Sequence, residues 1–250
     1  MTYKLIGVGT NAKTVKGDGS EYLTAILYMT PWKVMVDGKQ FNSCPMAETA
    51  DCIKGCLYTA GRGKFSNVQK ARMRKTEWFY RDREGFMDQL VLDIHKFTNY
   101  CEKRGIQPCV RLNGTTDIRW ETIKVEGWSI ENDKEVEAKN IFELFPEVQF
   151  YDYTKISNRK TKQIHNYHLT WSYSGANVQY AAKLQDALDN GMNAAVVFRK
   201  PYTRSQWRGI NVIDGDKDDL RFLDPKESIV ALYAKGDARK NTTGFVVDFN

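Results

Sequence analysis

The run His168-Leu-Thr-Trp-Ser-Tyr173, followed at a distance by Ala194-Ala-Val-Val-Phe198, decides the fold class of this chain. Both runs are rich in β-branched and aromatic residues, which is typical of strands. Between them, Ser174-Gly175 predicts a turn, residues 178–189 carry a helical pattern, and Gly191 marks the end of that helix. Two strands joined by a helix favour parallel pairing with a right-handed crossover.

The same alternation of strands and helices extends outward in both directions. Residues 67–103 carry apolar side chains three and four positions apart, which predicts one long helix that Gly85 interrupts. Further strands are expected at residues 3–8, 22–29, 33–36, 108–113, 148–153, 210–213 and 229–233, with a short helix at 140–145. We therefore predict an α/β fold: a partial or complete (β/α) barrel over residues 44–250, with an N-terminal β-rich extension, residues 1–43, packed on it.

The composition indicates a chain with a well-buried core. Of its 250 residues, 42% are hydrophobic and 12% are aromatic. No segment approaches the run of roughly 18 apolar residues that a membrane span needs. The N-terminus has no charged start followed by an apolar stretch, so no secretory signal is visible. We expect a cytoplasmic protein with no membrane partner.

Basic residues gather in two segments of this moderately basic chain, whose formal net charge is +6. Residues 64–83 carry seven Lys and Arg against two acidic residues, and residues 155–162 carry four with no acidic residue. Two such segments could form a surface that attracts phosphate groups, including those of nucleic acid. The alternative is a solvated helix face and a solvated loop.

Three of the five cysteines, Cys44, Cys52 and Cys56, fall within thirteen residues. Disulfides would leave one of them unpaired and are not maintained in a reducing cytosol. Thiolates hold iron–sulfur clusters at varied spacings, and three of them leave one iron open. A structural zinc site prefers Cys-x-x-Cys pairs or added histidines, and no histidine occurs before His95. We predict that the three cysteines hold an iron–sulfur cluster, with a 4Fe–4S cluster as the expected form. Zinc and three unliganded thiols are the alternatives.

Polar residues gather at the carboxyl ends of the predicted strands, where a (β/α) barrel places its functional groups. Alternation along the strand puts Arg111 and Asn113 on one face. An arginine inside a barrel needs a partner, which Asp117 or a bound anion could supply. Polar residues also lie at or near the ends of three further predicted strands: Asp152, Ser172 and Arg199. This repetition indicates a shared pocket. The alternative is that each polar side chain simply faces water.

Several segments resemble the bacteriophage gene product 88 family. The resemblance is carried by Ser43-Cys44-Pro45, by Cys52 with Cys56-Leu-Tyr58, by Gly61-Arg-Gly-Lys-Phe65, and by residues 110–117 and 150–155. It covers most of residues 40–200. It implies a virus-encoded protein that acts in the cytoplasm of the host cell.

A loop with three cysteines ahead of repeated strand–helix units is also similar to the radical S-adenosylmethionine (SAM) enzymes. In those enzymes the open iron of a 4Fe–4S cluster binds SAM. The resemblance implies that Cys44, Cys52 and Cys56 are the cluster ligands. It also implies that five strand-end residues hold SAM or substrate: Arg111, Asn113, Asp152, Ser172 and Arg199. The cysteines are spaced more widely here than in that superfamily.

These observations leave different classes of function open. The first is a redox or radical enzyme that uses an iron–sulfur cluster, with a small molecule, a nucleotide or nucleic acid as its substrate. The second is a non-catalytic module that binds nucleic acid or a host protein and whose metal site staples the fold. A third is a hydrolase that uses His165 or His168 with Asp152, although the chain has no serine elbow and no His-Glu-x-x-His segment.

Overall fold

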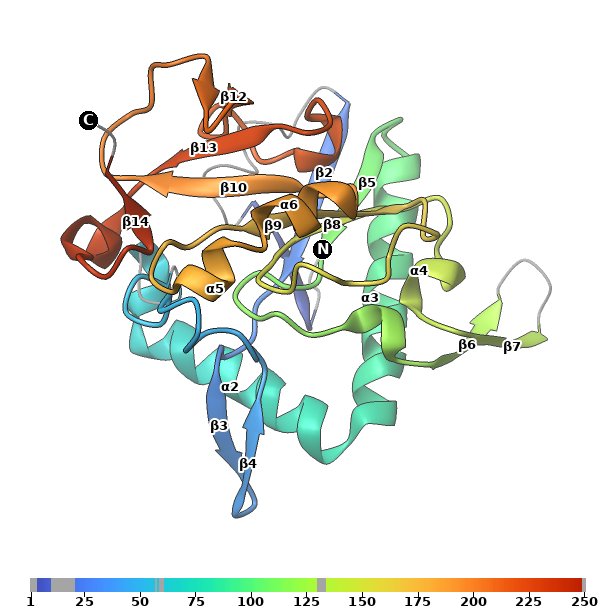
Figure 1. Ribbon diagram of the computed structural model, residues 1–250. Helices are drawn as coiled ribbons and strands as arrows, with labels where there is room; N and C mark the ends of the chain where they lie inside the picture. Colours follow the sequence, from blue (N-terminus) through green and yellow to red (C-terminus); the bar gives the residue numbers. More distant parts are fainter. Residues whose placement is uncertain (1–3, 10–20, 57, 59–60, 130–133, 249–250) are drawn as a thin grey trace.

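The computed structural model of the protein describes residues 4–9, 21–56, 58, 61–129 and 134–248. Its centre is a ten-stranded sheet against which the longer helices pack (Figure 1). The strand order is β1-β2-β5-β8-β9-β10-β13-β12-β11, and β14 also pairs with β10. These strands are β1 (Ile6–Val8), β2 (Tyr22–Leu27), β5 (Gln107–Arg111), β8 (Gln149–Thr154), β9 (Tyr167–Ser172), β10 (Asn193–Phe198), β11 (Gln206–Trp207), β12 (Ile210–Asp214), β13 (Ile229–Tyr233) and β14 (Val246–Val247).

The inner strands of the sheet run parallel, as the strand–helix–strand pattern predicts. Each neighbouring pair from β2 through β5, β8, β9, β10 and β13 to β12 is parallel. The strands β1 and β11 are antiparallel additions at the two edges.

The predicted (β/α) barrel is wrong, because the sheet is mixed and stays open. A barrel closes only when its two edge strands pair with each other. Here the short strands β1 and β11 occupy the two edges, and neither pairs with the other. In addition, irregular segments without an α-helix join β8 to β9 and β12 to β13, so the outer ring of helices is incomplete.

The described part of residues 1–43 contributes strands to the main sheet. Strand β2 pairs in parallel with β5, where Ala25 lies beside Val110. A hairpin of β3 (Lys33–Val36) and β4 (Lys39–Asn42) projects beyond the sheet (Figure 1). Its turn falls at Asp37-Gly38, as the sequence predicts. The φ angles there are 49° and 76°, which is typical of the type I′ turns that suit the twist of a hairpin.

The helix predicted over residues 67–103 is two helices, α2 (Ser66–Arg81) and α3 (Arg83–Glu102). They meet at Asp82, whose carboxylate accepts a hydrogen bond from the Gly85 N–H at 2.9 Å. This N-cap satisfies a free amide and starts α3. A Cβ at Gly85 would lie 2.4 Å from Oδ2 of Asp82, so the glycine makes room for the cap. The glycine therefore marks a helix break that lies three residues before it.

Shorter elements complete the chain. The helix predicted over residues 178–189 divides into α5 and α6. The remaining elements are α4 (Ile141–Leu144), α5 (Val178–Ala181), α6 (Leu184–Asp189), the hairpin of β6 (Val125–Ser129) and β7 (Lys134–Ala138), and the 3-10 turns η2 (Gly61–Lys64), η3 (Trp120–Thr122), η4 (Arg221–Leu223) and η5 (Gly236–Lys240). Among the described helices, none is both long enough and apolar enough to cross a membrane.

The two faces of the sheet differ in chemistry. One face is apolar and packs against the long helices through Val110, Phe150, Trp171, Phe86, Leu90, Ile94 and Phe97. The side chains that alternate with the apolar strand residues form a polar face that includes Arg111, Tyr153 and His168. Residues 218–224 cover this polar face, where Arg111 contacts Asp219. Because both faces are buried, the polar groups must find partners inside the protein.

Candidate cysteine site at the carboxyl ends of the strands

The cysteine loop, defined as residues 43–56, leads from β4 toward α2 and lies across the carboxyl ends of the parallel strands (Figure 1). Asp117, which follows β5, donates its backbone N–H to the Ser43 carbonyl at 2.8 Å. Ser174, which follows β9, donates its hydroxyl to the Ala50 carbonyl at 2.7 Å. The loop therefore lies where open parallel sheets commonly place their ligand sites.

The three cysteines of the loop are half-buried and form no disulfide. The thiol of Cys44 lies 3.7 Å from the Thr115 carbonyl, and Sγ of Cys56 accepts a hydrogen bond from the Tyr58 N–H at 3.5 Å. Burial raises the pKa of all three thiols, that of Cys44 to about 12. The charge of Cys56 adds to the rise at Cys44, and that of Cys52 to the rise at Cys56, so Cys56 lies within electrostatic reach of both other thiols. In the described part of the chain, no three His, Cys, Asp or Glu side chains already converge as metal ligands.

Lys155 places a positive charge beside these thiols. Its Nζ donates to the carbonyl and the hydroxyl of Ser172 at 3.1 Å and 2.9 Å, and it lies 4.7 Å from the ring centroid of Phe245. Burial lowers the pKa of Lys155, and the negative charge of Cys52 opposes that change. The ammonium in turn partly offsets the rise in the pKa of Cys52 and Cys56. Lys155 therefore favours the thiolate form of both cysteines.

Arg72, buried on α2, is a second cation at the site. Its guanidinium lies 4.8 Å from the ring centroid of Tyr28 and 5.2 Å from that of Tyr58, and Nη1 donates to the Tyr58 carbonyl at 3.2 Å. Burial lowers the pKa of Arg72, and its charge partly offsets the rise at Cys56. Among the described residues, neither Arg72 nor Lys155 has a carboxylate oxygen within 4.0 Å.

Asp117 lies beneath the loop, and it does not pair with Arg111. Its carboxylate accepts hydrogen bonds from the Thr154 hydroxyl and the Lys155 N–H, each at 2.8 Å, and lies 3.4 Å from Nη1 of Arg159. Burial raises the pKa of Asp117, and the charge of Arg159 opposes that rise. The carboxylate therefore fixes the end of β8, from which the Lys155 side chain extends.

Arg111 pairs with Asp219 instead, at 2.6 Å between Nη1 and Oδ2, and both side chains are buried. The Tyr153 hydroxyl donates to the other oxygen of Asp219 at 3.3 Å. The guanidinium also lies 5.6 Å from the ring centroid of Tyr151 and 5.3 Å from that of Tyr153. Arg111 thus holds the 218–224 segment against the polar face of the sheet.

Asn113 and Asp152 belong to one buried hydrogen-bond network. The Asn113 N–H donates to Oδ1 of Asp152 at 2.9 Å, and the Tyr167 hydroxyl donates to Oδ2 at 3.2 Å. The side-chain oxygen of Asn113 accepts from the Ile118 N–H at 2.9 Å and from Nε1 of Trp120 at 3.2 Å. Burial raises the pKa of Asp152 to about 7. These contacts hold the turn that follows β5.

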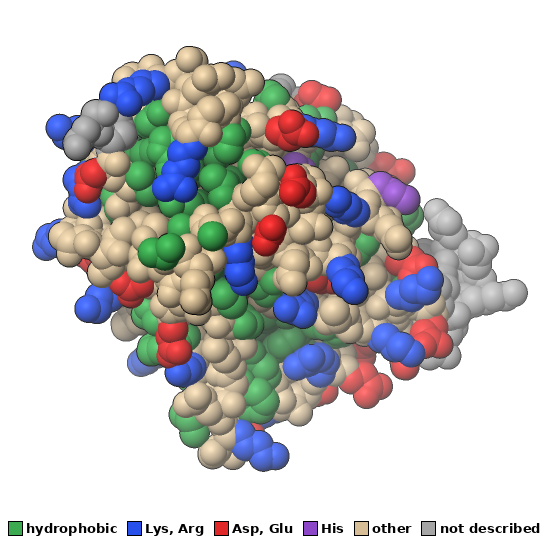
Figure 2. Space-filling model, in the orientation of Figure 1, with side chains coloured by type: hydrophobic (Ala, Val, Ile, Leu, Met, Phe, Trp, Pro, Cys, Tyr) green, Lys and Arg blue, Asp and Glu red, His purple; other side chains and the backbone are tan. Residues whose placement is uncertain are grey.

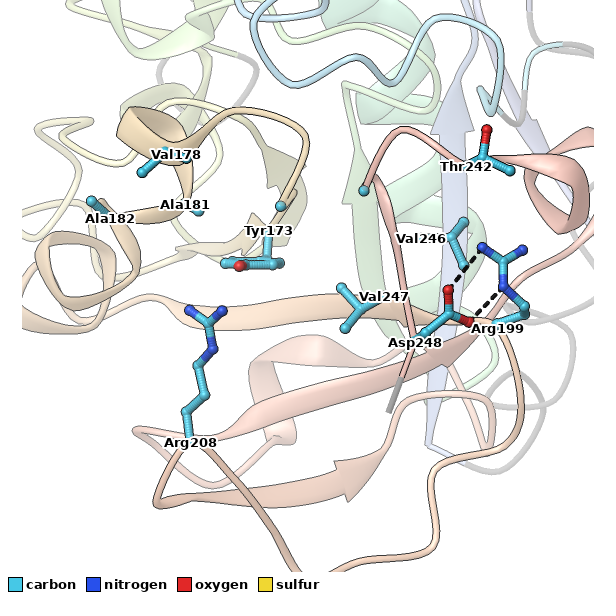
Figure 3. Close-up of a pocket in the computed structure, with 12 residues that line it drawn as sticks. Tyr173, Val178, Ala181, Ala182, Arg199, Arg208, Thr242, Val246, Val247 and Asp248 are labelled. Atoms are coloured by element: carbon cyan, nitrogen blue, oxygen red, sulfur yellow. Dashed lines mark hydrogen bonds and ion pairs between the residues drawn. The ribbon is translucent and has the colours of Figure 1, made fainter. Parts of the chain in front are cut away.

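The other two residues predicted to bind a ligand lie apart from each other. The hydroxyl of Ser172 accepts a hydrogen bond from the ammonium of Lys155, so Ser172 lies at the cysteine site. Arg199 pairs with Asp248 at 2.6 Å, and its Nη2 donates to the Asn241 carbonyl at 2.7 Å. It lines a pocket beside β14 (Figure 3). The structure therefore does not gather the five residues in one pocket.

Comparison with protein families gives a match over almost the whole chain. The model of the family described as gene product 88 aligns with residues 4–248. The chain belongs to this family. A search of curated proteins and a search of solved structures found no match. The resemblance to the bacteriophage gene product 88 family is thus confirmed, and no match supports the resemblance to radical SAM enzymes.

In this gene product 88 family member, several residues of the two basic segments face inward. Arg159 is buried between Asp117 and Glu121, whereas Arg81 is exposed and pairs with Asp37 at the surface. Arg72 and Lys155 lie at the cysteine site. The residues of the two segments that are exposed and make no side-chain hydrogen bond or ion pair to the described chain are Lys64, Lys70, Arg74 and Lys160. Less positive charge is therefore available to a partner than the sequence alone indicates.

Of the two histidines considered for hydrolysis, His165 and His168, the second does not face Asp152. Strand register places Asp152 beside Leu169 and Tyr151 beside His168. Because successive side chains of a strand point to opposite faces, His168 and Asp152 lie on opposite sides of the sheet. Burial lowers the pKa of His168 to about 4, and its Nε2 has no hydrogen-bond partner among the described residues. The two side chains do not form an acid–base pair.

Proposed function

We propose that this protein is an iron–sulfur protein in which Cys44, Cys52 and Cys56 hold a cluster above the carboxyl ends of the strands. The observation that carries the proposal is the pair of cations, Lys155 and Arg72, which act on these thiols and have no carboxylate oxygen within 4.0 Å among the described residues; the charge of Asp117 reaches Lys155 only from further away. A cation removed from water needs a negative group nearby. Protonated thiols do not supply one, whereas thiols that bind a metal lose their protons.

The donor set fits an iron–sulfur cluster better than a structural zinc ion. A structural zinc ion takes four protein ligands, usually as closely spaced pairs. The loop offers three thiols, and the three histidines of the chain, at positions 95, 165 and 168, all lie outside it. Three thiolates suffice for a cluster that keeps one iron open to a further ligand. Such a cluster supplies one-electron redox chemistry when it is bound.

The residues around the loop would tune and position this centre. Lys155 holds its ammonium beside Cys52 and Cys56 by hydrogen bonds to both oxygens of Ser172. A fixed positive charge favours the state of the site that carries the extra electron. Asp117 acts as a positioning residue, because it accepts the Lys155 N–H at 2.8 Å and so fixes the backbone from which the ammonium extends.

A more specific version of the proposal assigns the open iron to SAM. Its support is the chain order: the cysteine loop precedes the helices α2 and α3 and the alternating strands and helices that follow them. This is the order that the resemblance to radical SAM enzymes implies. Ser172 is the residue predicted to hold SAM or substrate that lies beside the loop. The architecture of the sheet, which is open and not a closed barrel, gives no support to this version of the proposal.

A binding module stapled by a metal is the second candidate function. Its support is the way the loop is tied into the fold: the Ser43 carbonyl accepts a hydrogen bond from the Asp117 N–H, and the Ala50 carbonyl accepts one from the Ser174 hydroxyl. Gly55 also packs so closely on Phe245 that a Cβ there would lie 3.0 Å from the ring. In that case loss of a thiol ligand would unfold the protein. Exposed Lys and Arg on α2 would supply part of the contact with a nucleic acid.

Anaerobic purification followed by iron, sulfide and zinc analysis tests the proposal. We expect a brown protein with iron and acid-labile sulfide, and we expect Cys52→Ser to remain folded by circular dichroism but to lose iron. Cys101→Ser is the matched control, because Cys101 is a fully buried thiol on α3, outside the loop, and should leave the iron content unchanged. Stoichiometric zinc together with an unfolded Cys52→Ser variant would favour the binding module. Absence of iron and zinc after reconstitution would overturn the metal site altogether.

A further inference from the structure

A pocket of about 580 Å³ lies beside β14, at the carboxyl end of the sheet (Figure 3). Strand β9 pairs with β10 as far as Ala195, and β14 pairs with β10 from Val197 onward. The pocket lies where β14 takes the place of β9 along β10, with Tyr173 on one side and Val247 on the other. Crevices of this kind, beyond the carboxyl ends of parallel strands, are common ligand sites.

The walls of the pocket are largely apolar. Val178, on α5, is 84% exposed, and Ala181 and Val247 line the pocket with it. Figure 2 shows apolar side chains gathered over the region of β10, β13 and β14, with a basic side chain among them. An exposed apolar surface rimmed by polar groups marks an interaction site.

Arg208 reaches toward this pocket from the turn between β11 and β12 (Figure 3). Its guanidinium lies 4.6 Å from the ring centroid of Trp207 and 5.3 Å from that of Tyr173, and within the described residues it makes no ion pair. The backbone places Arg208 at φ 51° and Gly209 at φ 78°. A type I′ turn of this form favours Asn, Asp or Gly at the position that Arg208 occupies. Strain of this kind clusters where a side chain is needed for function.

The other guanidinium of the pocket is already bound. Arg199 holds the Asp248 carboxylate through Nε at 2.6 Å and Nη2 at 3.2 Å. Its Nη1 and Nη2 also donate to the carbonyls of Arg239 and Asn241. Because the Arg199–Asp248 pair is neutral, Arg208 is the one unpaired charge of the described lining. A ligand with one negative charge complements it, whereas a phosphate would find no second unpaired cation there.

We propose that this pocket binds a small monocarboxylate with an apolar body. The carboxylate pairs with Arg208, because a planar guanidinium binds a carboxylate through two parallel hydrogen bonds. The apolar body packs on Val178 and Val247. A volume of about 580 Å³ lies within the usual range for small-molecule sites. The inference is independent of the proposed cluster, because none of the loop cysteines lines the pocket.

Calorimetric titration of the full chain with 4-phenylbutyrate tests the ligand class. The neutral 4-phenylbutanamide has the same shape and serves as the matched probe. We expect the acid to bind at least about tenfold more tightly than the amide. The reason is that hydrogen bonds between two charged groups contribute about that factor to the binding constant. Equal affinity for the two probes, or no binding of the acid, would overturn the proposal.

The variant Arg208→Asn separates the loss of the ligand from a loss of folding. Asn-Gly is a favoured type I′ turn, so the melting temperature should be equal to or higher than that of the wild type. Affinity for 4-phenylbutyrate should fall about ten- to hundredfold. Lys200→Gln is the control, because it removes an exposed charge that does not line the pocket, and it should leave the affinity unchanged. Full affinity in Arg208→Asn would refute the assignment.

Discussion

The carboxyl group of Asp152 allows a sharp test of the buried network at the end of β5. Burial raises its pKa from 3.8 to about 7, although the charge of Arg111 and the hydrogen bond from Asn113 oppose the rise. This rise in the pKa of Asp152 corresponds to about 4 kcal/mol in the free energy of unfolding. Because the pKa is higher in the folded state than in the unfolded state, the contribution is fully present below about pH 4. It is lost as the pH rises through about 7.

The variant Asp152→Asn removes the titration and keeps the size of the side chain. Its carbonyl oxygen can accept from the Asn113 N–H, and its amide can donate to the Tyr167 hydroxyl. We expect the unfolding free energy of the variant minus that of the wild type to rise by about 4 kcal/mol between pH 4 and pH 8 in urea denaturation. Taking the difference cancels the titration of Asp117 and Asp224, whose pKa values burial also raises. A difference that stays flat with pH would refute the reasoning.

Three other changes test the polar face, the sheet and the cysteine site. Asp219→Asn should lower the unfolding free energy by about 3–5 kcal/mol, because it leaves the buried charge of Arg111 unpaired. Adding Arg111→Met should recover most of the loss in urea denaturation; no recovery would contradict the pairing. Gly114→Ala should cost about 1–3 kcal/mol by thermal melting, because its Cβ would lie 2.7 Å from Cγ2 of Ile26. In the cluster-loaded protein, Lys155→Met should lower the midpoint potential by about 50–100 mV and Lys155→Arg should not. Equal midpoint potentials in Lys155→Met and the wild type would show that the charge of Lys155 does not act on the cluster.

Most strands could be predicted from the sequence, but the way the sheet ends could not. Strands β8, β9 and β10 are rich in aromatic or β-branched residues and have clear turn residues beyond them, so their pattern is strong. Strands β1 and β11 have three and two residues, too few to show a period. Those short antiparallel edges decide that the sheet stays open. The order of strands and helices therefore predicts parallel pairing but does not predict closure.

The candidate site could likewise be predicted only in part from the sequence. The three cysteines stand out because they are close together in the chain. Lys155 and Arg72 do not, because in the sequence they are members of two basic segments and their burial depends on the fold. The sequence also could not identify the partner of Arg111, because Asp219 lies 108 residues further along the chain. The Asn113-Gly-Thr-Thr-Asp117 segment was the one visible signal for Asp117, and its contact with the cysteine loop required the structure.

The position of the cysteine loop has a consequence for how the protein matures. The loop lies within residues 28–106, which separate β2 from its neighbour β5 in the sheet. Closing so long a connection delays the pairing of these strands. The groups that anchor the loop, Asp117 and Ser174, are synthesised later still. The three thiols therefore take up their final positions only after most of the chain has emerged and folded. Occupancy of the site by a metal would report that the sheet has been assembled at least as far as β9.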